Sequence, residues 1–143
     1  MTNARMLKDY RMHVLELQEV QEHIRQTERM LNPRGLQAHR ADTVRGTNDP
    51  TAATMQLLVG LEALEERIRQ EMSQLQPRID AMLAQVMDFR LLVILRQYYL
   101  CGSTDAEIAA VLNLSDRYVC KLRNGYIRTQ EKEEILHCTP SAH

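Results

Sequence analysis

The sequence is poor in aromatic residues, which sets a first limit on its fold. Only 4% of its 143 residues are aromatic and there is no tryptophan. Leucine, methionine, alanine, glutamine, glutamate and arginine are abundant instead, and these residues favour long helices over a sheet. We therefore expect an all-α fold, either one domain or a small domain with an extended arm.

Long apolar runs are also missing. No segment approaches the roughly 20 apolar residues of a membrane span, and no signal peptide opens the sequence. The three cysteines, Cys101, Cys120 and Cys138, are odd in number and widely spaced, as in proteins that keep their thiols reduced. These features predict a cytoplasmic protein that has no membrane partner.

Signatures of catalysis and metal binding are absent from the sequence as well. Zinc binding by the cysteines with His137 is conceivable, but no C-x-x-C pair occurs. The histidines are scattered, without an H-E-x-x-H motif or the spacing of a nucleophile and its base; they are His13, His23, His39, His137 and His143. We expect no enzyme, no catalytic residue, no metal, no cofactor and no small-molecule substrate.

The first third of the chain has a heptad pattern. Apolar residues from Leu7 to Leu31 follow alternating steps of three and four, and Gln21 and Glu28 occupy the two remaining positions of the seam. This spacing of about 3.5 residues lets a helix pack along another at a shallow angle. Pro33 and Gly35 end the pattern, and the polar stretch that follows predicts a loop over about 32–50.

A second seam follows this loop. Asp49 is placed to cap a helix that has Pro50 in its first position. The seam continues past Pro77 and is interrupted only by Glu65; its members are Leu58, Leu61, Ile68, Met72, Leu75, Ile79, Met82, Val86 and Phe89. The helix could bend at Pro77 or restart there.

The two seams predict a long antiparallel helical hairpin, or coiled coil, over residues 1–87. The same helices could also pair with those of a second chain. We expect a homo-oligomer, preferably a dimer, and the residues predicted to form its interface are Leu58, Leu61, Ile68, Met72 and Leu75. Gln21, Glu28 and Glu65 are either register markers or parts of a solvated seam.

The last part of the chain predicts a helix-turn-helix. Apolar residues on nearly every side of 88–100 predict a buried supporting helix. Thr104 is placed to cap the next helix in a capping box with Glu107, and Asn113 suits the turn after it. Ser115 then caps a further helix, 115–128. We expect a DNA-binding domain over 88–130 and an acidic, disordered tail over 131–143.

The helix over 115–128 has two different faces. Val119, Leu122 and Tyr126 share one side. The opposite side carries residue types that bind phosphates and read base edges; they are Arg117, Lys121, Asn124 and Arg128. An ordinary amphipathic helix with a solvated basic face is the alternative.

The order of residues from Arg90 to Arg128 resembles the fourth region of bacterial sigma factors, in which a helix packs behind a helix-turn-helix that reads promoter DNA. With the long helices before it, the chain is similar to small phage regulators of the RinA and ArpU type, which are associated with activation of late genes. The resemblance implies the cytoplasm of a bacterial host cell as the location, and double-stranded DNA and host RNA polymerase as partners. It also implies DNA contacts at Ser115, Arg117, Tyr118, Lys121 and Asn124.

Three functions are compatible with these patterns. The first is a sequence-specific DNA-binding transcriptional regulator, an activator of phage or mobile-element genes, that inserts the 115–128 helix into the major groove. The second is the small DNA-recognition subunit of a phage packaging terminase, for which a ring of many copies would be expected. The third is a protein-interaction module whose helix-turn-helix contacts RNA polymerase or a repressor.

Overall fold

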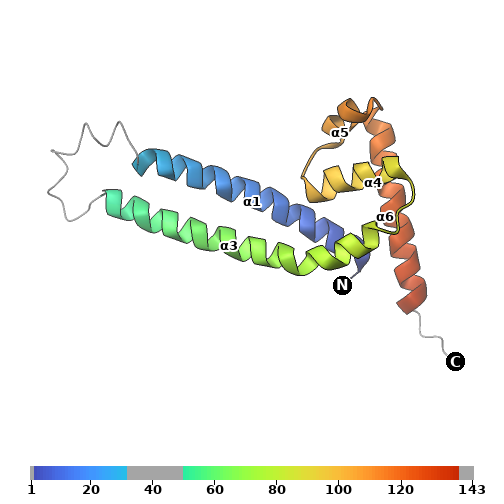
Figure 1. Ribbon diagram of the computed structural model, residues 1–143, viewed down its shortest axis with the longest axis horizontal. Helices are drawn as coiled ribbons and strands as arrows, with labels where there is room; N and C mark the ends of the chain where they lie inside the picture. The colour runs from blue at the N-terminus through green and yellow to red at the C-terminus, as the bar shows by residue number, and fades with distance from the viewer. Residues whose placement is uncertain (1, 32–49, 139–143) are drawn as a thin grey trace. The chain divides into compact units, whose positions relative to one another are not determined.

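The computed structural model describes residues 2–31 and 50–138, and all regular structure in these residues is helical. The elements are α1 (Asn3–Leu31), α3 (Pro50–Leu83), α4 (Phe89–Leu95), the π-helical turn η1 (Arg96–Leu100), α5 (Asp105–Leu112) and α6 (Asp116–Cys138) (Figure 1). None of these helices is long and apolar enough to cross a membrane. The all-α prediction is confirmed.

The predicted loop over 32–50 and the proposed cap Asp49 lie outside the described residues, except that Pro50 begins α3. The second long helix does not restart at Pro77, because α3 continues through this residue to Leu83. A proline inside a helix removes one backbone hydrogen bond. The surrounding packing, which buries Ile79 and Leu83 completely, compensates for that loss.

Two compact units divide the described chain. The first contains residues 1–15 and 72–143, and the second contains residues 16–71. The sequence predicts a boundary between residues 87 and 88 instead. The packing differs because the first four turns of α1 and the end of α3 contact the C-terminal helices rather than only each other.

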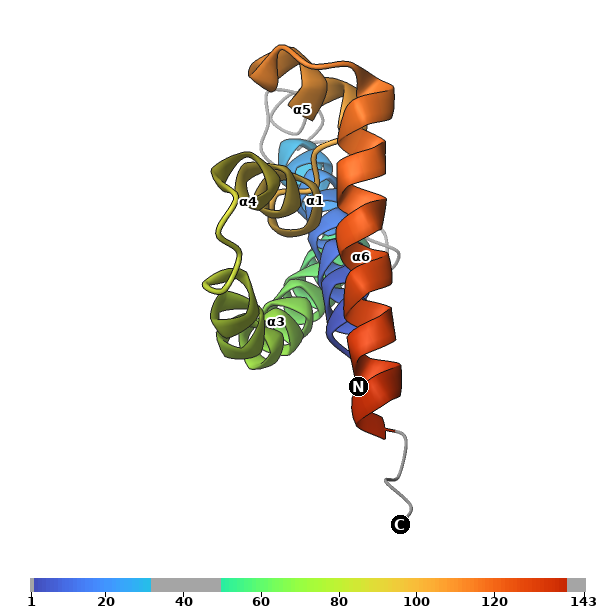
Figure 2. The same ribbon diagram turned by 90° about the vertical axis from the view of Figure 1, so that its right-hand side faces the viewer.

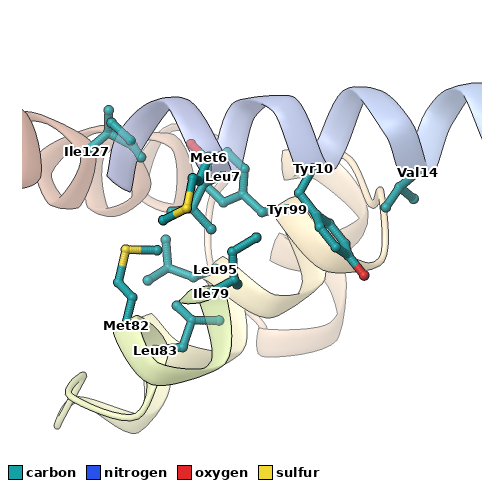
Figure 3. Packing of buried hydrophobic residues seen from close by; sticks show 11 residues of the cluster. Met6, Leu7, Tyr10, Val14, Ile79, Met82, Leu83, Leu95, Tyr99 and Ile127 are labelled. Atoms are coloured by element: carbon teal, nitrogen blue, oxygen red, sulfur yellow. The ribbon is translucent and has the colours of Figure 1, made fainter. Parts of the chain in front are cut away.

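The core of the first unit joins five helical elements of the chain (Figure 3). Met6, Leu7, Tyr10 and Val14 come from α1, and Ile79, Met82 and Leu83 come from α3. Leu95, Tyr99 and Ile127 complete the cluster from α4, η1 and α6. The hydroxyl of Tyr10 also donates a hydrogen bond of 2.6 Å to Oε1 of Gln76. Burial of this apolar surface is the main force that holds the unit together.

In the second unit α1 and α3 are joined by a polar contact between two seam positions. Nε2 of Gln21 donates a hydrogen bond of 3.2 Å to Oε2 of Glu65, which also accepts one from Arg69. The hydrogen bond from Arg69, followed by that from Gln21, lowers the pKa of Glu65 below its ordinary value. Of the three polar seam residues, Gln21 and Glu65 therefore pair across the helices, whereas Glu28 is exposed.

The predicted supporting helix over 88–100 is present as α4 and the directly following η1, and it ends at Leu100 as expected. One prediction about a helix end is wrong. The predicted disordered tail is helical as far as Cys138, and only 139–143 lie outside the described residues. The side chains of this segment are partnered by α1, because Asn3 hydrogen-bonds Gln130 and Glu134, and Lys8 forms an ion pair with Glu131 at 3.5 Å.

Most apolar seam residues of α3 pack against other parts of the same chain. Ile68 is only 2% exposed, and Met72 and Leu75 pack against the core of the first unit. Leu58 and Leu61 are half-buried. Phe89 belongs to the seam pattern but is 77% exposed. Because α3 ends at Leu83, Phe89 no longer lies on the same helix face as the earlier seam residues.

Candidate nucleic-acid interface

A short capped turn connects α5 to α6. Thr104 and Glu107 form the predicted capping box, in which the Thr104 hydroxyl accepts from the Glu107 amide and the Glu107 carboxylate accepts from the Thr104 amide. Asn113 ends α5 in the left-handed conformation, with φ 57° and ψ 48°. The hydroxyl of Ser115 then accepts a hydrogen bond from the amide of Tyr118. The local signals predicted from sequence at these positions are confirmed.

A small apolar cluster fixes the positions of α4, α5 and α6 relative to one another. Ile94 of α4, Ile108 and Ala109 of α5, and Val119 of α6 are buried together. Leu112, Leu114 and Leu122 pack against this cluster. Figure 2 shows α5 beside the N-terminal end of α6, with α4 alongside the same helix. One face of the first half of α6 is thereby covered, and its other face is left to solvent.

The predicted DNA-contacting residues all have exposed side chains; they are Ser115, Arg117, Tyr118, Lys121, Asn124 and Arg128. Arg117, Lys121, Asn124 and Arg128 follow steps of four, three and four along α6 and therefore share a face. A shallow depression on this face is lined by Asp105, Asp116, Arg117, Cys120, Lys121 and Arg128. We call the exposed surface formed by Arg117, Lys121, Asn124 and Arg128 the basic face of α6.

Arg117 and Lys121 form no ion pair with any other residue in the part of the chain that the structure describes. Asn124, in contrast, is already engaged. Its Nδ2 donates to Sγ of Cys120 at 3.2 Å, and its Oδ1 accepts from Arg123 at 3.2 Å. These two contacts fix the orientation of the Asn124 amide, which keeps its second N–H and a second oxygen lone pair for another partner. No ion pair has to be broken before Arg117 or Lys121 binds an anion.

Arg123 belongs to the same basic sequence segment but not to the basic face. It is 9% exposed, and its Nε and one terminal nitrogen donate to Asp105 at 3.1 and 2.7 Å. Its guanidinium carbon lies 3.8 Å from the centroid of the Tyr98 ring. Burial alone would lower the pKa of Arg123, but the hydrogen bonds to Asp105 and further contacts raise it overall. The charge of Arg123 is therefore compensated inside the protein.

Arg11 and Tyr98 contact each other, and the sequence pattern does not predict this contact. The guanidinium carbon of Arg11 lies 3.7 Å from the centroid of the Tyr98 ring. Arg11 also donates to the backbone carbonyls of Tyr98 and Ser103, at the end of η1 and just before α5. Arg11 is one charged residue on the surface of a long helix, and nothing in its spacing distinguishes it from solvated neighbours.

No cluster of three or more histidine, cysteine, aspartate or glutamate side chains that could hold a metal ion occurs within residues 2–31 and 50–138. Cys101 is exposed and Cys120 is half-buried, and both are free thiols.

No protein-family model matches this chain, and no curated protein or solved structure is significantly similar to it.

Proposed function

We propose that this protein is a sequence-specific DNA-binding transcriptional regulator whose α5 and α6 form a helix-turn-helix. The observation that carries the proposal is the basic face of α6. Three positive side chains, Arg117, Lys121 and Arg128, are exposed on one side of a helix whose opposite side is fixed by α4 and α5. A helix of this kind fits the major groove, where arginine and lysine bind phosphates and guanine edges.

The turn before α6 supports the same interpretation. In a helix-turn-helix the second helix enters the groove with its N-terminal residues, and Ser115, Arg117 and Tyr118 occupy that end of α6. An N-terminal helix end also favours phosphate binding, because its backbone amides point outward and its dipole is positive. Asp116 is the single acidic residue in this first turn.

The contacts between α1 and α3 support the interpretation of these helices as an antiparallel hairpin. A step of eleven residues up α1, from Tyr10 to Gln21, corresponds to a step of eleven residues down α3, from Gln76 to Glu65. Paired positions change in opposite directions when two helices run antiparallel. In this proposal the hairpin is an arm of the DNA-binding unit.

DNA binding is tested with single substitutions on the basic face. We expect Arg117→Ala and Lys121→Ala each to weaken binding to a selected duplex by about 1–3 kcal/mol if the side chain reads a base. The duplex would be enriched from a random oligonucleotide pool by the wild-type protein, and affinity would be measured by fluorescence anisotropy at several salt concentrations.

Arg67→Ala is the matched control, because it removes one exposed positive charge from α3. It should leave the affinity unchanged, and circular dichroism should show that all three variants keep their helical content. If neither α6 substitution changes affinity, or if the wild-type protein enriches no sequence at low salt, the proposal is wrong.

A further inference from the structure

The first half of α3 is apolar around its whole circumference. Residues 51–64 include one charged side chain, Glu62, and nine aliphatic or methionine side chains besides Gly60. A helix that is hydrophobic on all sides is normally buried on all sides. In this chain α1 covers one side, where Leu58 and Leu61 are half-buried. Leu64 is half-buried as well, and the other apolar side chains of this segment are exposed in the described structure; they are Ala52, Ala53, Met55, Leu57, Val59 and Ala63.

The exposure of these side chains is large. Met55 is 51% exposed, Leu57 54% and Val59 62%. Ala52, Met55, Val59 and Ala63 follow steps of three, four and four, so they form one continuous row on the helix. We call this row the outward stripe of α3. Contiguous apolar surface of this kind on a monomer marks an interaction site.

We propose that the outward stripe is the interface through which two copies of this chain associate, with the two α3 helices antiparallel about a two-fold axis beside Val59. Such an interface is formed by the same surface on both copies, so it has to be complementary to itself. The stripe meets this condition, because a two-fold axis at Val59 places Met55 at the same height as the partner subunit's Ala63. A large side chain then lies beside a small one, twice by symmetry.

The lack of charge on the outward stripe also favours a second copy of this chain as its partner. The outward stripe contains no charged residue, so two copies bring no like charges together within it. The segment of this chain nearest in sequence, residues 32–49, is a poor alternative cover. It contains three arginines, two aspartates and only two large aliphatic residues, Leu36 and Val44. A second α3 helix supplies the matching row of apolar side chains that residues 32–49 lack.

This interface differs from the one that the heptad pattern predicts. The predicted interface residue Ile68 is buried within the chain, and Met72 and Leu75 pack in the core of the first unit. A second copy cannot reach Ile68 unless α1 and α3 separate, and Met72 and Leu75 are already half-buried within the chain. The outward stripe can be covered without any change in the contacts between α1 and α3, and its role does not depend on DNA binding.

The test is the mass of the full-length protein in solution. We expect light scattering to show a dimer for the wild type, and we expect Val59→Glu to raise the dimer dissociation constant by at least about tenfold, because a carboxylate would be buried at the two-fold axis. Since Val59 is exposed in the single chain, this variant should keep its helical content. Met87→Glu is the matched control, because Met87 is 93% exposed but lies outside α3, and it should remain a dimer.

A cross-link distinguishes this interface from any other. In a background where the three native cysteines are replaced by serine, Val59→Cys should form a covalent dimer on mild oxidation, whereas Ile135→Cys, also at an exposed position, should not. A monomeric wild type at high concentration would overturn the proposal. So would a dimer that persists in Val59→Glu and gives no Val59→Cys cross-link, since its interface would lie elsewhere.

Discussion

The guanidinium of Arg123 is largely removed from water. It contacts two protein groups instead, the carboxylate of Asp105 and the ring of Tyr98. Its side chain is 10% exposed and that of Asp105 is 23% exposed. A buried ion pair gives little net stability compared with apolar residues of the same shape, but loss of one partner leaves the other charge without compensation. Arg123 therefore serves the packing of α5 on α6, and its position in a basic segment does not make it a DNA contact.

Arg123→Ala should destabilise the fold by about 3 kcal/mol, the lower end of the range for a broken buried pair, because water can still reach Asp105. Urea unfolding followed by circular dichroism would measure the change. Arg128→Ala, which removes an exposed arginine from the same helix, should change stability by less than about 0.5 kcal/mol. Adding Asp105→Asn to Arg123→Ala should restore part of the loss. Equal effects of the two arginine substitutions would contradict the buried pair.

At the scale of single elements, α5 shows how local sequence determines a helix start. The helix is only eight residues long, so its stability depends strongly on its ends and its packing. Hydrogen bonds from the backbone and the hydroxyl of Thr104 lower the pKa of Glu107 below its ordinary value of 4.5. The charged form of Glu107 therefore stabilises the folded state.

This stabilisation should depend on pH. Because the pKa is lowered in the folded protein, the contribution is fully present above pH 4.5 and is lost as the pH falls through the lowered value. Glu107→Ala should therefore lower the thermal midpoint at about pH 7, and the difference from wild type should shrink at about pH 3. Thermal melts followed by circular dichroism at both pH values would measure it.

Glu62→Ala is the control, since it removes another exposed carboxylate, from the interior of α3 and away from any helix end. A Glu107→Ala effect that is the same at both pH values would show that the carboxylate charge does not contribute to the cap.

At the scale of the whole molecule, the compact unit is assembled from both ends of the chain. Leu95, Tyr99 and Ile127 are buried against Met6, Leu7 and other side chains of α1 and α3. A fragment limited to 88–143 would expose these apolar groups, although the heptad pattern suggests a boundary near residue 87. The C-terminal helices therefore need residues 1–15 and 72–87 to complete their core.

Two shortened proteins would test this assembly. Fragment 88–143 should unfold without a cooperative transition, whereas a chain with Leu15 joined to Met72 by a short flexible linker should unfold cooperatively. The linker can be short, because Tyr10 and Gln76 are in contact and connections between packed helices commonly need 2–8 residues. Thermal melts followed by circular dichroism would compare the two. A cooperative transition in fragment 88–143 with the midpoint of the full chain would refute the shared core.

Structure that depends on neighbours along the chain can be predicted from the sequence. Thr104, Asn113 and Ser115 were identified because a cap or a left-handed turn needs only a few consecutive residues. The pairing of Arg123 with Asp105 could not be predicted in this way, because it depends on how α5 crosses α6. The helical end of α6 could not be predicted for the same reason, since its partners Asn3 and Lys8 lie more than 120 residues earlier.

The π-helical turn η1 has the geometry that results when one extra residue is inserted into an α-helix. The amide of Cys101 donates to the carbonyl of Arg96, five residues back instead of four. Deletion of one residue from 96–100 would restore an α-helical turn and rotate the following side chains by about 100°. Tyr98 would then no longer lie beside both Arg11 and Arg123, while the sequences of α5 and α6 would be unchanged. In an alignment with a homologous chain, a one-residue gap between Leu95 and Gly102 would therefore mark the gain or loss of this link between α1 and α6 during evolution.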